Sequence, residues 1–170
     1  GGALVQELET RLAAYHGVPH CIAVANAASG LLMLLRTLGR KPGGEVIMPA
    51  FSYRGLPHFA RWAGHMPRFC DVDAASHTLD PDAVQRAIGS DTAVVLAVSN
   101  FNSAGDVEGL CDIAQKSGIP ILFDSVYAMA NTHRGIRMGG FGAAEVFSLH
   151  ATKLLNGFEG GYITTRDAEL

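Results

Sequence analysis

Cysteine is scarce in this chain of 170 residues, which holds only Cys21, Cys70 and Cys111. These three are far apart and form no C-x-x-C pair, which argues against a disulfide framework and against a zinc site. We expect each to be a small buried hydrophobic residue in a protein of the reducing cytoplasm. The histidines have no metal-binding spacing such as H-E-x-x-H, so no metal site is predicted. We expect most of them to be surface or partly buried polar residues.

Long apolar runs and basic clusters are also missing. No apolar stretch reaches the roughly 18 residues of a transmembrane helix, and the N-terminus lacks the basic-then-apolar order of a signal peptide. The formal charge is −3, without a lysine or arginine run, which disfavours both nucleic acid and a membrane as partners. No G-x-G-x-x-G follows the first predicted strand, which disfavours a dinucleotide-binding Rossmann protein.

The segments that are present alternate between strand-like and helix-like patterns. Strands are predicted at 21–25, 45–48, 66–72, 92–98, 120–123, 146–149 and 162–165, and helices at 5–15, 31–38, 50–64, 80–88 and 107–116. The run TAVVLAV at 92–98 is uniformly apolar, as in a parallel strand buried on both faces. With 48% apolar residues, the chain suits one domain. The pattern predicts a three-layer α/β/α sandwich with a mostly parallel sheet.

Polar residues follow several of the predicted strands. They are Asn26–Ser29, Ser52–Tyr53, Asn100, Asp124 and Ser148–Lys153. Open α/β sheets bind ligands beyond the carboxyl ends of their strands. Asn26, Ser29 and Asp124 could each simply cap a helix or turn. Together, however, a helix N-terminus for phosphate, an aromatic ring, a carboxylate and a lysine are the groups that pyridoxal phosphate requires.

Lys153 lies between the apolar run 146–149 and the glycine-rich turn 156–161. Desolvation in such a setting favours a neutral, nucleophilic amine, which a Schiff-base lysine needs. A surface lysine on a loop between two strands is the alternative that this stretch alone leaves open.

The order of these motifs resembles the DegT/DnrJ/EryC1/StrS family of pyridoxal-phosphate aminotransferases, which act largely on nucleotide-linked keto-sugars. The resemblance spans essentially the whole chain and includes GGEVIMPAFSY, ILFDSVYAMA and EVFSLHATKLLNGFEGGYITT. The most specific element is the lysine motif, in which serine, a spacer, histidine, two residues and lysine precede E-G-G.

The resemblance implies roles for four residues around the cofactor ring. Lys153 would be the Schiff-base lysine and the base that moves the substrate proton. Asp124 would pair with the pyridine nitrogen, and Tyr53 would stack on the ring. Tyr127 stands where the family usually has Gln or His, a residue that contacts the phenolic oxygen of the cofactor.

The resemblance also implies a phosphate site made by the backbone N–H groups of Ala27 and Ala28 and the hydroxyl of Ser148. Ala28 replaces a family threonine, which removes one hydroxyl. Ser99 replaces the histidine of the H-x-F/Y-G turn, and Asn102 replaces its glycine. These departures concern the substrate more than the cofactor.

From the resemblance, residues 1–170 are expected to form a pyridoxal-phosphate-binding large domain of fold type I, with the C-terminal small domain absent. The implied protein is a cytoplasmic homodimer. It would transfer an amino group, from glutamate, to a keto-sugar nucleotide by a ping-pong Schiff-base mechanism. Lys153 argues against the dehydratases of the family, which carry a histidine there. A non-catalytic or truncated binding or regulatory module is the alternative.

Overall fold

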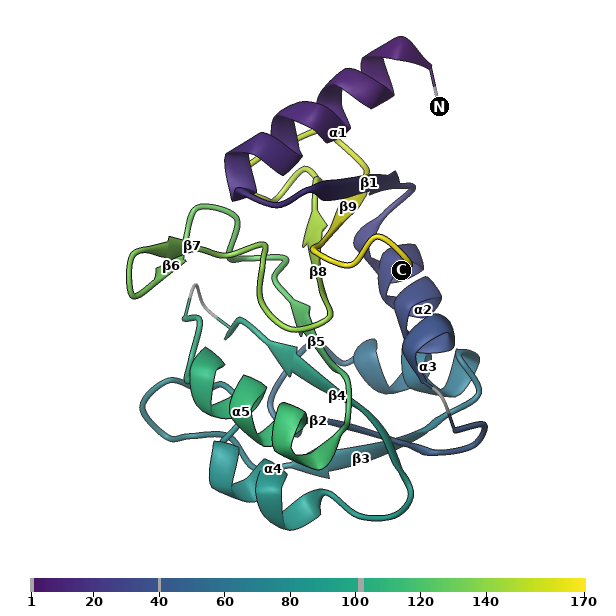
Figure 1. Cartoon of the computed structure of the whole chain (residues 1–170), viewed down its shortest axis with the longest axis vertical. Coiled ribbons are helices and arrows are strands. Elements are labelled where there is room, and N and C mark those ends of the chain that lie inside the picture. The colour runs from purple at the N-terminus through teal and green to yellow at the C-terminus, as the bar shows by residue number, and fades with distance from the viewer. Residues whose placement is uncertain (1, 40, 101–102) are drawn as a thin grey trace.

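The computed structural model describes residues 2–39, 41–100 and 103–170. The helices are α1 (Ala3–His16), α2 (Ala27–Leu38), α3 (Leu56–Trp62), α4 (Pro81–Ala87) and α5 (Val107–Ser117). The strands are β1 (His20–Val24), β2 (Glu45–Pro49), β3 (Met66–Cys70), β4 (Thr92–Val98), β5 (Ile121–Asp124), β6 (Thr132–His133), β7 (Ile136–Arg137), β8 (Ala144–Ser148) and β9 (Gly161–Thr165). Figure 1 shows their arrangement.

The described residues form a seven-stranded sheet in the order β1-β9-β8-β5-β4-β2-β3, with β6 and β7 as a separate hairpin. The pairs β2/β3, β2/β4, β4/β5 and β5/β8 are parallel, whereas β9 is antiparallel to both β1 and β8. The predicted, mostly parallel sheet is therefore confirmed. Every residue of β4 is buried, as its uniformly apolar sequence predicts.

Helices cover both faces of the sheet, and each face has its own core (Figure 1). Val95 and Ala97 of β4 belong to the core that also contains residues of α1, α4 and α5. Val94 and Leu96 belong to the core with α2 and α3. Alternate residues of one strand thus enter different cores, as the period of two in a strand requires. The three-layer sandwich predicted from the sequence is confirmed.

The structure corrects one predicted helix and adds one hairpin. Helix α3 begins at Leu56 with Pro57 in its first turn, whereas the sequence predicted a helix from about residue 50. Proline lacks the N–H that an interior helical position uses, so it is favoured in the first turn. Residues 50–55 instead form a loop, which Asn100 holds by donating from Nδ2 to the carbonyl of Phe51 at 2.9 Å. The β6–β7 hairpin was not predicted.

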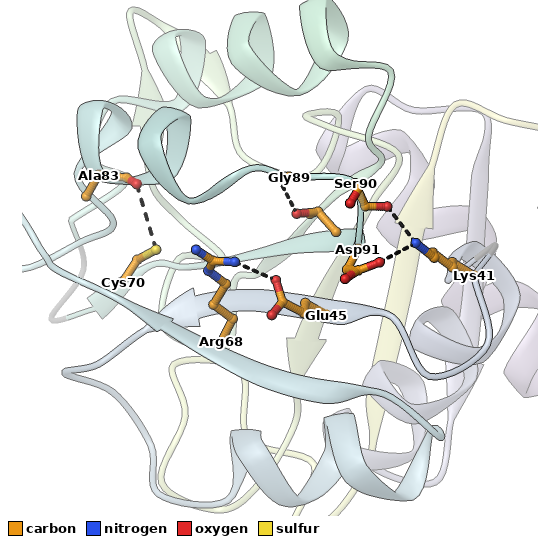
Figure 2. A network of polar contacts seen from close by, with 9 residues as sticks. Lys41, Glu45, Arg68, Cys70, Ala83, Gly89, Ser90 and Asp91 are labelled. Atoms are coloured by element: carbon orange, nitrogen blue, oxygen red, sulfur yellow. Dashed lines mark hydrogen bonds and ion pairs between the residues drawn. The ribbon is translucent and has the colours of Figure 1, made fainter.

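Polar contacts tie together the sheet margin that contains β2, β3 and the start of β4 (Figure 2). Nζ of Lys41 lies 2.5 Å from Oδ1 of Asp91 and 2.6 Å from the carbonyl of Ser90. Arg68 of β3 reaches Glu45 of β2 at 2.7 Å. These side chains are largely exposed, so each pair contributes at most about 1 kcal/mol. Glu45 and Asp91 lie at or just before the amino ends of their strands, opposite the carboxyl edge.

Two histidines are more buried than the sequence predicted. His16 and His65 are each only 4% exposed. His16 ends α1 and packs against Phe147, with ring centres 4.6 Å apart. The three cysteines are free, with Cys70 buried and Cys21 and Cys111 half-buried.

Within residues 2–39, 41–100 and 103–170, no group of three or more His, Cys, Asp or Glu side chains is placed to hold a metal ion. None of the described helices has the length and apolar character needed to cross a membrane.

Candidate active site

The N-terminus of α2 is closed by a reciprocal cap. The N–H of Ser29 donates to Oδ1 of Asn26 at 2.9 Å, and the N–H of Asn26 donates to the hydroxyl of Ser29 at 3.2 Å. The capping role that the sequence left open for these residues is therefore confirmed. The N–H groups of Ala27 and Ala28 belong to the first turn, where no intrahelical acceptor exists. They remain suited to an anion.

Gly161 brings this helix end close to the lysine-bearing segment. It pairs with Val24 of β1 on one side and with Ser148 of β8 on the other. A Cβ atom at Gly161 would lie 2.6 Å from the nitrogen of Ala27, so a side chain would not fit there. Because the packing is this close, Ser148 and the start of α2 both lie against Gly161. The two halves of the predicted phosphate site are thus neighbours across β9.

Asp124 ends β5 and is buried, with 4% of its surface exposed. Among the described residues, the hydrogen bond to its carboxylate comes from the N–H of Val126, at 3.3 Å. Burial raises the pKa of Asp124 to about 6, while the Val126 N–H and the charge of Lys153 act in the opposite direction. A buried carboxylate with so few donors is costly when ionised. Its surroundings suit a ligand that brings a proton-bearing nitrogen.

Asp124 opens into a cavity of about 480 Å³ at the carboxyl edge of the sheet. The cavity is lined by Phe51, Ser52, Tyr53, Val98, Asn100, Asp124, Val126 and Tyr127. The structure thus brings together Tyr53 and Asp124, which are 71 positions apart in the sequence. The hydroxyl of Ser52 is buried and has no hydrogen-bond partner within the described part of the chain. A flat polar ring fits such a cavity, which has aromatic side chains and unpaired polar atoms.

Lys153 lines an adjoining cavity of about 260 Å³, together with Tyr127, Ser148 and Thr152. Lys153 is half-buried, and its Nζ lies 3.4 Å from the centre of the Tyr127 ring. The predicted site residues therefore surround two neighbouring cavities. Ala27 and Ala28 line neither cavity. They lie near Ser148 because both segments pack against Gly161 of β9. The roles of all these residues stay predictions.

One important residue was not singled out from the sequence. Glu145 of β8 is fully buried and accepts hydrogen bonds from the hydroxyl of Ser125 at 2.6 Å and from the N–H groups of Gly139 at 2.6 Å and Phe141 at 2.9 Å. Burial raises the pKa of Glu145. The bond to Ser125 fixes the residue that directly follows Asp124. A charged residue inside the apolar run AEVFS was the signal in the sequence.

Ser99, one of the residues that depart from the family pattern, directly follows β4. The hydroxyl of Ser99 is buried without a hydrogen-bond partner among the described residues, and the Ser99 N–H donates to the carbonyl of Asp124 at 3.0 Å. Ser99 therefore supports the strand end that carries the carboxylate. Asn102 lies outside the described residues.

The whole chain, residues 1–170, matches the model of the DegT/DnrJ/EryC1/StrS aminotransferase family. It is 35% identical over 156 residues to the L-glutamine:2-deoxy-scyllo-inosose aminotransferase of Streptomyces fradiae, covering 92% of this chain and 37% of that protein. It is 35% identical over 169 residues to the 3-amino-5-hydroxybenzoate synthase of Amycolatopsis mediterranei, covering 99% and 44%. A UDP-2-acetamido-2-deoxy-3-oxo-D-glucuronate aminotransferase of Pseudomonas aeruginosa is 33% identical over 170 residues, covering 99% and 47%.

Solved structures agree with these relatives. DesI, crystallised in the presence of its TDP-sugar product, superimposes with a TM-score of 0.91 at 39% identity, covering 99% of this chain and 43% of DesI. The sugar aminotransferase Spr1654 of Streptococcus pneumoniae, in its PLP form, gives a TM-score of 0.93 at 28% identity, covering 100% and 47%. The chain thus spans less than half the length of these relatives. The family match and the shared fold confirm the resemblance seen in the sequence: this chain belongs to the DegT/DnrJ/EryC1/StrS aminotransferase family of pyridoxal-phosphate enzymes.

Proposed function

We propose that the full-length protein is a pyridoxal-phosphate-dependent aminotransferase whose acceptor is a ketone on a polyhydroxylated ring. The observation that carries the proposal is the convergence of Tyr53, Asp124 and Lys153 on two adjoining cavities at the carboxyl edge of the sheet. No single residue of the three is specific. Their grouping beside a helix N-terminus matches what this cofactor needs.

The residues present fit the cofactor at both ends. The N–H groups of Ala27 and Ala28 and the hydroxyl of Ser148 would hold its phosphate, and Tyr53 would cover one face of its ring. Asp124 would accept a hydrogen bond from the ring nitrogen. Among the described residues, the buried carboxylate accepts from the Val126 N–H at 3.3 Å, and a cationic partner would stabilise its ionised form.

When bound, pyridoxal phosphate supplies a carbonyl that reacts with amines and a ring that accepts the electrons of a broken C–H bond. Asp124 would hold the proton on the ring nitrogen, because a carboxylate in a buried site stabilises a positive charge beside it. The amine of Lys153 would bind the cofactor covalently and would also serve as the base that moves the proton between the substrate carbon and the cofactor.

We propose a donor and an acceptor by analogy with the relatives. The names of the relatives include L-glutamine with cyclic inosose acceptors and a UDP-linked 3-oxo sugar. We infer a ketone on a sugar or cyclitol ring as the acceptor, with a keto-sugar nucleotide as the specific proposal, and glutamate or its amide glutamine as the donor. The donor and the acceptor would react in two successive half-reactions at one cofactor, which gives ping-pong kinetics.

The domain organisation, location and oligomeric state of the full-length protein are also proposals. Residues 1–170 would form the large domain of a cytoplasmic protein with a C-terminal small domain, because relatives of the same family are more than twice as long. The protein would be a homodimer. Leu154 and Phe158, which follow Lys153, are 77% and 83% exposed, and apolar side chains this exposed beside a site favour cover by a second surface.

The test uses the full-length protein loaded with pyridoxal phosphate. We expect visible absorbance of the bound cofactor, and reduction with borohydride should fix the cofactor on the peptide that contains Lys153. Lys153→Ala should lose both signals, whereas Lys116→Ala, an exposed lysine of α5, should keep them. Persistence of the signals in Lys153→Ala would overturn the lysine assignment.

Turnover separates the aminotransferase from a binding module. Glutamate and glutamine should each be tried as donors, against a panel of inososes and keto-sugar nucleotides. Amination of at least one ring ketone is expected. Cofactor binding without turnover of any pair would favour the non-catalytic alternative, which the departures at Ala28, Tyr127 and Ser99 support.

A further inference from the structure

Tyr127 lines both cavities of the candidate site. Asp124 and Tyr53 line the cavity of about 480 Å³, and Lys153 and Ser148 line the cavity of about 260 Å³. Among the residues that line them, Tyr127 and its neighbour Val126 are shared by both cavities. A ligand that fills both cavities therefore lies against Tyr127 and Val126.

Tyr127 also holds the lysine. The Nζ atom of Lys153 lies 3.4 Å from the centre of the Tyr127 ring, well inside the distance of about 6 Å at which a cation is attracted by the face of an aromatic ring. The ring keeps the amine in the smaller cavity.

The backbone around Tyr127 is anchored by hydrogen bonds, whereas its ring is half-exposed. Ser125 and Ala128 are fully buried and joined by an N–H to carbonyl bond of 2.9 Å, and the hydroxyl of Ser125 donates to Glu145. The Tyr127 side chain is 53% exposed. A rotation of this side chain would therefore move the ring away from Lys153 without any change in the turn that carries it.

We propose that Tyr127 is a positioning residue that holds Lys153 apart from the Asp124 cavity until a ligand enters, and that its ring turns aside during cofactor loading. This inference rests on the proposed function only for the identity of the ligand. The contact between the ring and the amine belongs to the protein without cofactor and can be tested by itself.

The first experiment measures the rate at which cofactor-free, full-length protein gains the visible absorbance of bound pyridoxal phosphate after rapid mixing. We expect Tyr127→Leu, which lacks the ring, to load about fivefold faster than the parent protein. Tyr127→Phe keeps the ring and should load more slowly than Tyr127→Leu. Tyr15→Leu is the matched control, because Tyr15 also carries a cation, Arg137, at 4.1 Å from its ring centre but does not line either cavity.

The second experiment needs no cofactor. An amine-reactive reagent is added to the cofactor-free protein, and the modification of Lys153 is followed by mass spectrometry of its peptide, with Lys116 as the internal reference. Lys153 should be labelled several-fold faster in Tyr127→Leu than in the parent protein. In Tyr127→Phe it should be labelled at the parent rate. Equal labelling in all three would overturn the proposal, as would equal loading rates. A parent protein that binds no pyridoxal phosphate would overturn the proposed function, while the labelling result would still decide the role of Tyr127.

Discussion

The hydroxyl of Tyr162 lies 3.0 Å from Nε2 of His16, a residue 146 positions earlier in the chain. Nδ1 of His16 lies 2.6 Å from the carbonyl of Met138, which can only accept. Nδ1 must therefore carry the proton, and Nε2 accepts from Tyr162. This histidine joins the end of α1 to β9 and to the segment that precedes β8. The stacked rings of Phe147 and Tyr162, with centres 4.8 Å apart, continue the contact from His16 to the sheet.

The neutral form of His16 predicts a loss of stability in acid. Burial is the main cause of the lowered pKa of His16 in the folded protein. The unfolded chain, with a histidine pKa of about 6.5, binds the proton more readily. The contribution of His16 is thus present above about pH 6.5 and falls as the pH falls below it. Urea denaturation at pH 8 and pH 5 should show a larger loss for the parent protein than for His16→Gln. An equal loss in both would contradict the prediction.

Asp124 predicts the opposite dependence on pH. Its pKa is about 6 when folded against 3.8 unfolded, so the folded protein binds the proton more tightly. Stability therefore falls as the pH rises from about 4 to 6, by on the order of 3 kcal/mol. Asp124→Asn should stabilise the cofactor-free protein at pH 8, with no such gain near pH 4, and should weaken cofactor binding. Exposed Asp112 of α5 offers the control: Asp112→Asn should do neither.

Gly161 predicts a steric effect on the start of α2. In Gly161→Ala the Cβ would lie 2.6 Å from the nitrogen of Ala27 and 2.8 Å from the carbonyl carbon of Asn26. Both are backbone atoms, so the helix end must move, at about 1–3 kcal/mol of stability. We expect at least a tenfold loss of pyridoxal phosphate affinity in a titration. Gly89→Ala, where nothing lies within 4 Å of the added Cβ, should change neither quantity.

Asn26 allows the helix cap and the anion site to be separated. Asn26→Ala removes the acceptor for the N–H of Ser29 and should cost about 1 kcal/mol in chemical denaturation. Asn26→Asp keeps the acceptor and should fold as stably as the parent protein. The added negative charge should nevertheless weaken the binding of pyridoxal phosphate. If Asn26→Asp bound the cofactor as tightly as the parent protein, the phosphate would not lie at this helix end.

Sequence patterns predicted most of the fold because they act within short segments. The apolar run of β4 and the helix that follows Asp106 have boundaries close to those predicted. The start of α3 was misplaced because the loop at 50–55 is held by Asn100, a contact across 49 positions. The β6–β7 hairpin has two residues in each strand, too few to give a recognisable alternation of apolar and polar residues.

The sequence by itself determined the family, the α/β alternation and the motif that contains Lys153, because these depend on residue types at short spacing. Only the tertiary structure decided that Gly161 joins Val24 to Ser148, that His16 and Glu145 are buried, and that Tyr127 lines both the Asp124 cavity and the Lys153 cavity. Each of these relationships depends on the order of strands in the sheet. That order is set by the burial of apolar surface over the whole chain, and no single segment encodes it.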